Sequence, residues 1–139
     1  LYEGMTVGGG YGKIANAGGG QGNDDEHYTA FVTYTASGVT VGYQESFVGN
    51  DQQGGIDEQA QAWGVAINLM EGLSASYGER EVEHIKPSLT HVTEDQEGFA
   101  VAYTMGSATL SVQNNEVSNN GGTAGTSDET FQVALSLAF

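Results

Sequence analysis

Apolar residues alternate with small or polar residues through most of this chain. The pattern is clearest at positions 131 to 139, where Phe, Val, Leu, Leu and Phe occupy the odd positions and Gln, Ala, Ser and Ala the even ones. A period of two is that of a β-strand with one apolar face. Seven other segments share the pattern, so the sequence predicts an all-β, antiparallel meander of eight strands. Their predicted ranges are Gly4–Gly12, His27–Ala36, Val39–Phe47, Gln61–Met70, Leu73–Val82, Gly98–Met105, Ala108–Asn115 and Thr130–Phe139.

Short and long connections alternate between these segments. Ser37-Gly38, Glu71-Gly72 and Gly106-Ser107 have the composition of tight hairpin turns. The other connections, predicted over Lys13–Glu26, Val48–Gln59, Glu83–Glu97 and Glu116–Glu129, are long, and glycines and acidic residues are frequent in them. One end of the sheet is therefore expected to carry tight turns and the other end long loops, an asymmetry typical of outer-membrane barrels.

The apolar positions keep one parity from strand to strand, which predicts a single apolar face. Aromatic residues recur on this face near the long-loop end, as expected for a girdle at a membrane interface. The alternative is the ordinary preference of aromatic residues for strands. Phe31 is an exception that faces the polar side, and Glu45 and Glu79 are exceptions that face the apolar side. The predicted girdle residues are Tyr11, Tyr28, Trp63, Phe99, Phe131 and Phe139.

The opposite face is built mainly from Gly, Ala, Ser, Thr, Asn and Gln. A closed barrel of about eight strands has an interior that side chains must fill, and such small residues do not fill it. They suit the wall of a wider, water-filled barrel. The predicted pore-lining residues are Thr29, Thr33, Gln44, Asn68, Arg80, Gln113 and Gln132.

The chain is strongly acidic, with 18 Asp and Glu against 3 Lys and Arg, a formal charge of −15. This balance excludes a nucleic-acid partner, because phosphate backbones are bound by Lys and Arg. Acidic composition also occurs in disordered chains, but regular alternation argues against disorder here. The chain has no Cys, which excludes a disulfide framework. It also has no apolar run of about 18 residues, as a transmembrane helix would need.

A short internal repeat links the start of the sequence to its middle. Residues Leu1–Val7 (LYEGMTV) parallel Leu69–Ala75 (LMEGLSA), in which Glu71-Gly72 is a predicted turn. By analogy, Leu1 is expected to be the tail of a further strand, and the sequence to be part of a longer protein.

These features resemble a general-diffusion porin of the Gram-negative outer membrane, of the alphaproteobacterial type, and the chain is similar to its C-terminal half. The resemblance rests on the terminal strand ending in Phe139, on Val39–Tyr43 (VTVGY), on Phe99–Gly106 (FAVAYTMG) and on the alternation of short and long loops. It covers nearly the whole sequence, so residues 1–139 are expected to be the C-terminal part of one transmembrane barrel domain.

The resemblance implies a barrel of about 16 strands, a homotrimer and a water-filled channel for small hydrophilic solutes and ions. It also implies contact with lipid and lipopolysaccharide, and recognition by the barrel assembly machinery through the strand ending at Phe139. Arg80, the one basic residue on the predicted inner face, is assigned a role in the pore wall. The acidic loops predict a leaning toward cations.

Other candidate chemistry is sparse. The segment Asn23–His27 (NDDEH) holds enough carboxylates to bind Ca²⁺ weakly, but it lacks the ligand spacing of a calcium loop and also fits a solvated loop. Glu79, Glu81 and Glu83 fit a hydrated rim better than a pair of acid and base groups. His27, His84 and His91 lack the spacing of metal ligands.

No catalytic residue and no cofactor is predicted, and the chain is not expected to be an enzyme. Two other functions remain open. A complete small barrel would serve as an adhesin or structural anchor through its acidic loops. An outer-membrane esterase or protease would need a nucleophile and a base near one rim.

Overall fold

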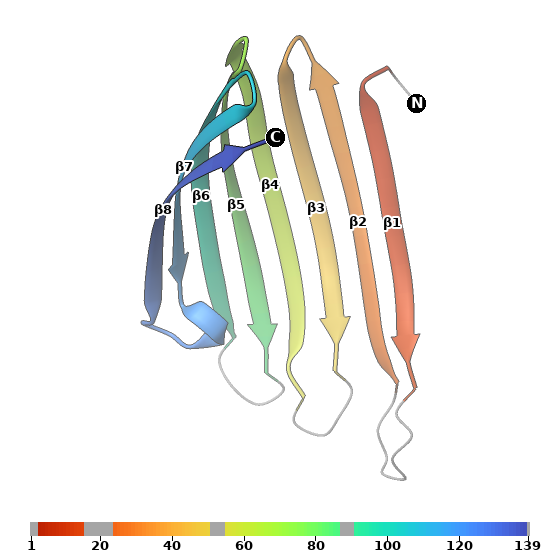
Figure 1. Ribbon diagram of the computed structural model, residues 1–139. Helices are drawn as coiled ribbons and strands as arrows, with labels where there is room; N and C mark the ends of the chain where they lie inside the picture. Colours follow the sequence, from red (N-terminus) through yellow and green to blue (C-terminus); the bar gives the residue numbers. More distant parts are fainter. Residues whose placement is uncertain (1–2, 16–23, 51–54, 87–90, 139) are drawn as a thin grey trace.

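The computed structural model describes residues 3–15, 24–50, 55–86 and 91–138. Over these residues the chain forms one antiparallel sheet in which each strand pairs with its neighbours in sequence (Figure 1). The predicted all-β meander is confirmed. None of the helices among these residues has the length and apolar character needed to cross a membrane. The strands are β1 (Met5–Ile14), β2 (Asp25–Ala36), β3 (Val39–Gly49), β4 (Asp57–Met70), β5 (Leu73–Ile85), β6 (Val92–Met105), β7 (Ala108–Ser118) and β8 (Ser127–Leu137).

The three tight turns lie where the sequence predicts them, and glycine conformation explains why. Ser37 and Gly38 both have positive φ, 50° and 78°, the requirement of a type I′ hairpin. Gly106, at the first position of its turn, has φ 61°, as type II′ turns need. The three turns lie together at the upper end of the sheet in Figure 1, and the longer connections lie at the lower end.

The internal repeat has a structural counterpart. Gly4 has φ 82° and Gly72 has φ 77°. The carbonyl oxygen of Gly4 accepts the N–H of Thr35 at 2.8 Å, as that of Gly72 accepts the N–H of Thr104 at 2.7 Å. Gly4 therefore has the geometry of a hairpin-turn glycine. Leu1 and Tyr2, the other part of this prediction, lie outside the described residues.

The strands extend further toward the long connections than the sequence predicts. β6 begins at Val92 rather than Gly98, and β5 ends at Ile85 rather than Val82. The alternation of apolar and polar residues stops before the hydrogen-bonded ladder does, because residues on both faces are polar at this end. The connection before β8 also contains a 3₁₀ turn, η1 (Asn120–Gly122), within the long loop that the sequence predicts over Glu116–Glu129.

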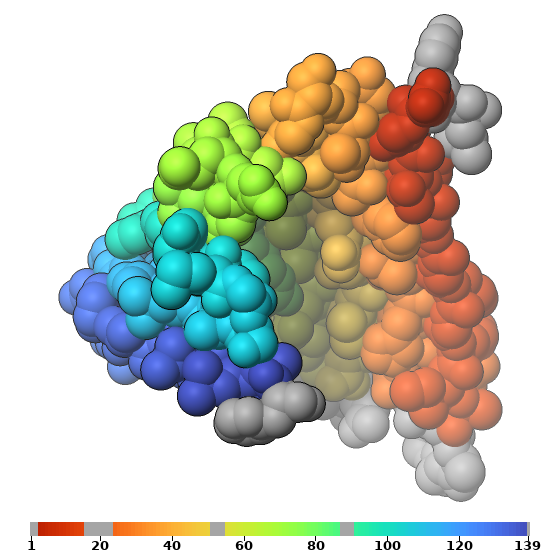
Figure 2. Space-filling view, turned by 45° about the horizontal axis from the view of Figure 1, so that its top comes forward, coloured from red at the N-terminus to blue at the C-terminus, as the bar shows by residue number. Residues whose placement is uncertain are grey.

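The sheet is strongly curved and does not close. Figure 2 shows a hollow between β1 (red) and β8 (blue), with β4 and β5 at the back. β1 pairs only with β2, and β8 only with β7. Both end strands therefore leave one row of backbone groups without a partner strand in this structure.

Phe31, which breaks the sequence parity, covers a glycine of the edge strand. Phe31 lies directly opposite Gly8 in the register of β1 and β2. A Cβ added to Gly8 would lie 2.4 Å from Cε1 of the Phe31 ring. The aromatic ring thus occupies the space that a side chain at position 8 would need, a form of packing known to support glycines in sheets.

This contact predicts opposite outcomes for two similar substitutions in β1. Gly8→Ala forces the Phe31 ring to move and should lower the free energy of unfolding by about 1–3 kcal/mol. Gly10→Ala is the matched control, because its nearest neighbour is Cγ2 of Thr29 at 3.9 Å, and it should be neutral or stabilising by up to about 1 kcal/mol. Equilibrium denaturation measures both. Equal effects of the two substitutions on the free energy of unfolding would show that the packing of the Phe31 ring does not require a glycine at position 8.

Candidate functional site

The register of the sheet places the apolar side chains of all eight strands on one face. Residues directly opposite each other in adjacent strands share a face, and one such row joins Tyr34, Val41, Val65, Tyr77 and Phe99. Most of these side chains are exposed, with 64% for Leu135 and 67% for Phe131. No second layer covers this face among the described residues. We call it the apolar face; along most of β6 its residues are exposed while those of the opposite face are half-buried or buried, so it is the outer, convex side of the curved sheet.

The predicted girdle residues follow a diagonal across this face. Tyr11 and Tyr28 are opposite each other in one row, Trp63 lies in a row four residues nearer the turns, and Phe99 and Phe131 share a row two residues beyond that. In a transmembrane barrel the strands are tilted relative to the membrane plane. Residues that lie at one level of the membrane therefore form a belt oblique to the hydrogen-bonded rows. The five described girdle residues are all exposed; Phe139 lies outside the described residues.

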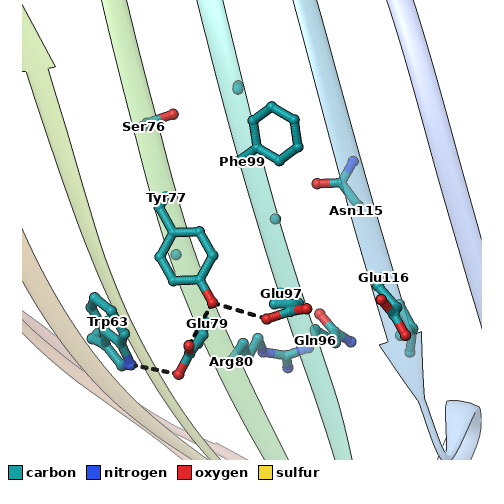
Figure 3. A pocket seen from close by; sticks show the side chains of 14 residues that line it. Trp63, Ser76, Tyr77, Glu79, Arg80, Gln96, Glu97, Phe99, Asn115 and Glu116 are labelled. Carbon is teal, nitrogen blue, oxygen red and sulfur yellow. Dashed lines mark hydrogen bonds between the residues drawn. The ribbon is translucent and has the colours of Figure 1, made fainter.

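Polar groups of the aromatic residues meet carboxylates where the belt ends. The hydroxyl of Tyr77 donates to Glu79 at 2.6 Å and to Glu97 at 2.9 Å, and Nε1 of Trp63 donates to Glu79 at 3.1 Å (Figure 3). The hydroxyl of Tyr43 donates to Glu45 at 2.7 Å. Glu45 and Glu79, the two acidic exceptions on the apolar face, are therefore both hydrogen-bonded by aromatic residues that reach toward the loops.

The opposite face, which lines the hollow, carries all seven predicted pore-lining residues. Gln44 and Arg80 share a row, and Gln113 is directly opposite Gln132, with a hydrogen bond of 2.6 Å between their side chains. Thr29 donates to the carbonyl oxygen of Glu45 at 3.2 Å. Thr33 and Asn68 lie on the same face by register. We call this the concave face.

Four glycines form a row across the middle of the concave face. Gly42, Gly64, Gly78 and Gly98 lie directly opposite one another in β3 to β6. A Cβ at Gly78 would lie 3.1 Å from the carbonyl oxygen of Trp63, so the backbones approach closely here. Glycines at such positions mark tight bends of a sheet, and the row accompanies the curvature of the hollow.

A compact cluster at the loop end of the concave face was not predicted from the sequence. Ala60, Val82, His84 and Glu94 are the buried residues other than glycine among those described. Nδ1 of His84 lies 3.6 Å from Glu58, and its Nε2 lies 3.7 Å from Glu94. A Cβ at Gly122 would lie 2.7 Å from Cγ of His84, so η1 packs against this histidine. His84 and Glu94 both lie in the connection predicted over Glu83–Glu97, so nothing in the strand pattern indicated that they share a face.

The carboxyl of Glu94 is held by donors from two elements. Gln96 donates to Oε1, and the N–H of Gly121 donates to Oε2 at 2.6 Å. Burial alone would raise the pKa of Glu94, but these two hydrogen bonds and the nearby His84 and Arg80 together lower the pKa below the usual value of a glutamate. Glu94 lies four residues before the predicted span that begins at Gly98, among the polar strand ends.

Charges divide unequally between the two faces. By register, ten acidic residues of the strands lie on the apolar face, within its aromatic belt or beyond it, whereas Asp25, Glu58, Glu94 and Asp128 lie on the concave face. Arg80 lies on the concave face, and Lys86 donates to the carbonyl oxygen of Gly122 there. Two of the three basic residues therefore face the hollow. The ten are Glu26, Glu45, Asp57, Glu79, Glu81, Glu83, Asp95, Glu97, Glu116 and Glu129.

The acidic segment Asn23–His27 is partly neutralised. Lys13 lies 3.4 Å from Asp24 and 3.3 Å from Glu26. Asn23 is outside the described residues. In the described ranges, no group of three or more His, Asp or Glu side chains is arranged to hold a metal ion. His27 lies in β2 and His84 in β5, and His91 pairs with Glu83 at 3.0 Å. Weak Ca²⁺ binding stays a prediction.

The lowered pKa of Glu94 predicts a pH-dependent contribution to stability. A carboxyl whose pKa is lower in the folded state stabilises that state above its unfolded pKa, and the contribution is lost as pH falls through the folded value. Replacing Gln96 by Leu removes one donor and should move the titration midpoint of Glu94 upward in a ¹³C NMR titration of the side-chain carboxyl. Asp95→Asn, on the other face of the same strand, should leave it in place. An unchanged midpoint in Gln96→Leu would contradict this account.

Comparison with known proteins adds no relative: no protein-family model, curated protein or solved structure matches this chain.

Proposed function

We propose that this chain is part of the wall of an outer-membrane porin, a water-filled channel through which small hydrophilic solutes and ions diffuse passively. On this proposal the apolar face contacts lipid and the concave face contacts water. The carboxylates beyond the aromatic belt face lipopolysaccharide. The working form is a homotrimer, assembled by the barrel assembly machinery through the strand ending at Phe139. No residue is catalytic.

The observation that carries the proposal is the exposure of the apolar face. A compact protein of 14.5 kDa exposes about 6,900 Å², whereas this chain exposes 9498 Å². Large apolar side chains contribute to this excess of accessible surface; Leu110, Val133 and Leu137, for example, are each about half exposed. Contiguous apolar surface of this extent requires a partner, and lipid accounts for its presence on every strand and for its diagonal aromatic border.

The open edges support a larger barrel. Unpaired backbone groups cost several kcal/mol each in lipid, so β1 and β8 need partner strands. β1 runs toward the long loops and β8 toward the tight turns (Figure 1), so an even number of added strands would keep every pair antiparallel. Gly4, with its hairpin-turn geometry, is where an upstream strand would connect. A barrel of about 16 strands formed with upstream residues fits these constraints.

The concave face supports permeation. Its Gly, Ala, Ser and Thr side chains leave the hollow open, and its polar atoms suit water. In such a channel, width and wall charge select the solute. Since four acidic and two basic residues of the described part face the hollow, the wall carries a modest negative charge. We therefore expect a slight preference for cations.

The runner-up is a small closed barrel that acts as an adhesin or structural anchor. It would require β1 to pair with β8, whereas both are edge strands here, and it would require an interior filled by side chains. The row of four glycines does not supply them. An esterase or protease would require a nucleophile beside a base. His84, the one buried histidine among the described residues, has carboxylates rather than a serine beside it.

Adjacent residues in β4 give the sharpest test of orientation. The natural chain has no Cys, so Gly64→Cys and Val65→Cys each carry one thiol. In membranes, a water-soluble maleimide that does not cross lipid should label position 64 and spare position 65. A charge at Val65 or Leu135 should destabilise the inserted protein by about 2–4 kcal/mol. Equal labelling of both thiols would overturn the assignment of faces.

The channel itself is tested by conductance in a planar bilayer. The full-length protein should conduct, with a reversal potential in a salt gradient that favours cations and weakens as salt rises, because screening shortens the reach of charge to about 10 Å at 0.1 M. The substitutions Asp25→Asn and Glu58→Gln neutralise two carboxylates of the concave face and should reduce the preference for cations. The matched control, Glu97→Gln with Glu116→Gln on the apolar face, should change it little. A protein that inserts but does not conduct is not a porin.

A further inference from the structure

The connection between β7 and β8 folds back over the concave face rather than extending away from it. Asn119 turns the chain with a left-handed conformation, φ 55° and ψ 39°, and η1 follows directly. Gly122 is buried and lies over His84 of β5. In Figure 1 this turn lies at the lower left, beside the ends of β6 to β8. Residues 119–126, here named the inner flap, therefore cover part of the hollow at its loop end.

Four hydrogen bonds tie the inner flap to three different places. The N–H of Gly121 donates to Glu94 at 2.6 Å, and Nδ2 of Asn119 donates to the carbonyl oxygen of Thr93 at 2.9 Å, both on β6. Lys86, just after β5, donates to Gly122 at 3.2 Å. Asn120 donates to Asp128 of β8. The flap is thus held by the wall, and its bond to Glu94 is the one to a buried charge.

The sequence of the flap suits this position. Gly121 and Gly122 have φ of 65° and 68°, a conformation that glycine adopts without strain. A side chain at position 122 would also collide with the His84 ring. Removing the flap would take away the N–H donor of Gly121 from Glu94 and the backbone of Gly122 that lies against the His84 ring. Glu58, Arg80, Lys86 and Asp128 are the other charged groups that surround this place.

We propose that the inner flap sets the open area of the channel mouth and that Glu94 is the positioning residue that holds it closed. This inference rests on the proposed function, because a mouth is narrowed only if the hollow conducts. The flap moves between the closed arrangement seen here and an open one in which Gly121 no longer donates to Glu94. The equilibrium between the two arrangements sets how often wide openings occur.

Replacing Glu94 separates the flap from the wall. Hydrogen bonds to charged groups contribute about 1.5–3 kcal/mol, so Glu94→Ala should raise the population of the open arrangement about 10- to 100-fold. Glu94→Gln keeps an acceptor oxygen for Gly121 and should stay closer to the natural protein. In single-channel records of the full-length protein, the Ala variant should dwell longer at a higher conductance level.

A disulfide provides the reverse test in one molecule. A Cβ at Gly122 would lie 3.1 Å from Cβ of His84, slightly under the distance of about 3.5–4.5 Å in disulfides, so a small shift of the flap would allow the bond. In the Glu94→Ala background, the pair His84→Cys and Gly122→Cys should show the lower conductance when oxidised and the higher one when reduced. The two single-cysteine variants are the controls and should not respond to reductant.

Thiol labelling examines the flap without any current. His84→Cys should react with the water-soluble maleimide more slowly than Gly64→Cys, and adding Glu94→Ala should speed its labelling about 10- to 100-fold. Equally fast labelling of positions 84 and 64 would show that the flap is not closed. Flap-dependent labelling without any change of conductance in a conducting protein would overturn the gating role alone. Flap-dependent labelling in a protein that never conducts would overturn both the channel and its gate.

Discussion

The hydrogen-bonded register between neighbouring strands is the constraint on which the rest of this structure depends. A strand shifted by one residue turns every side chain to the other face of the sheet. All seven pairings keep the apolar positions together, from Val7 opposite Val32 to Leu110 opposite Leu135. The tight turns help to fix this register, because Ser37-Gly38 and Gly106-Ser107 leave no residue that could slide into or out of the ladder. The two faces differ in chemistry only because this register holds.

The same register explains how carboxylates are tolerated next to the apolar belt. Glu79, Glu97 and Glu116 lie directly opposite one another in β5 to β7, an arrangement of like charges that is unfavourable by itself. Tyr77 donates to two of them through one hydroxyl, which places a polar group between the charges. The aromatic residues at this border therefore have two roles. Their rings extend the apolar surface, and their polar atoms donate hydrogen bonds to the nearest row of carboxylates.

Much of this fold follows from the sequence, because alternation, turn composition and strand order are local properties. The eight strands, the three turns and the shared parity were all predictable. The strand ends were not, because the ladder continues through Val92 to Glu97 after the apolar signal has stopped. Phe31 was recognisable as an exception, but its reason, Gly8, is 23 positions away and becomes adjacent only in the register.

The inner flap shows why the candidate site was harder to predict than the fold. Its principal contact joins Gly121 to Glu94, 27 positions apart, and the donor is a backbone N–H, which leaves no mark in the side-chain pattern. Glycine and asparagine in a loop indicate only that the chain turns there. His84 and Glu94 both lie in the connection predicted over Glu83–Glu97, so neither the face that they occupy nor the segment that covers them could be inferred.

The division of charge between the faces limits what net charge can say about permeation. A formal charge of −15 suggests a strongly negative mouth, yet ten of the strand carboxylates lie on the apolar side of the sheet, while Arg80 and Lys86 face the hollow. Carboxylates on the apolar face are separated from an ion in the proposed channel by the sheet, and the outer solution screens them. Charged residues on the concave face line the hollow and have no sheet between them and the ion. The selectivity of the proposed channel should therefore depend on a few concave residues and on the part of Glu94 that the flap leaves accessible, rather than on the total charge of the chain.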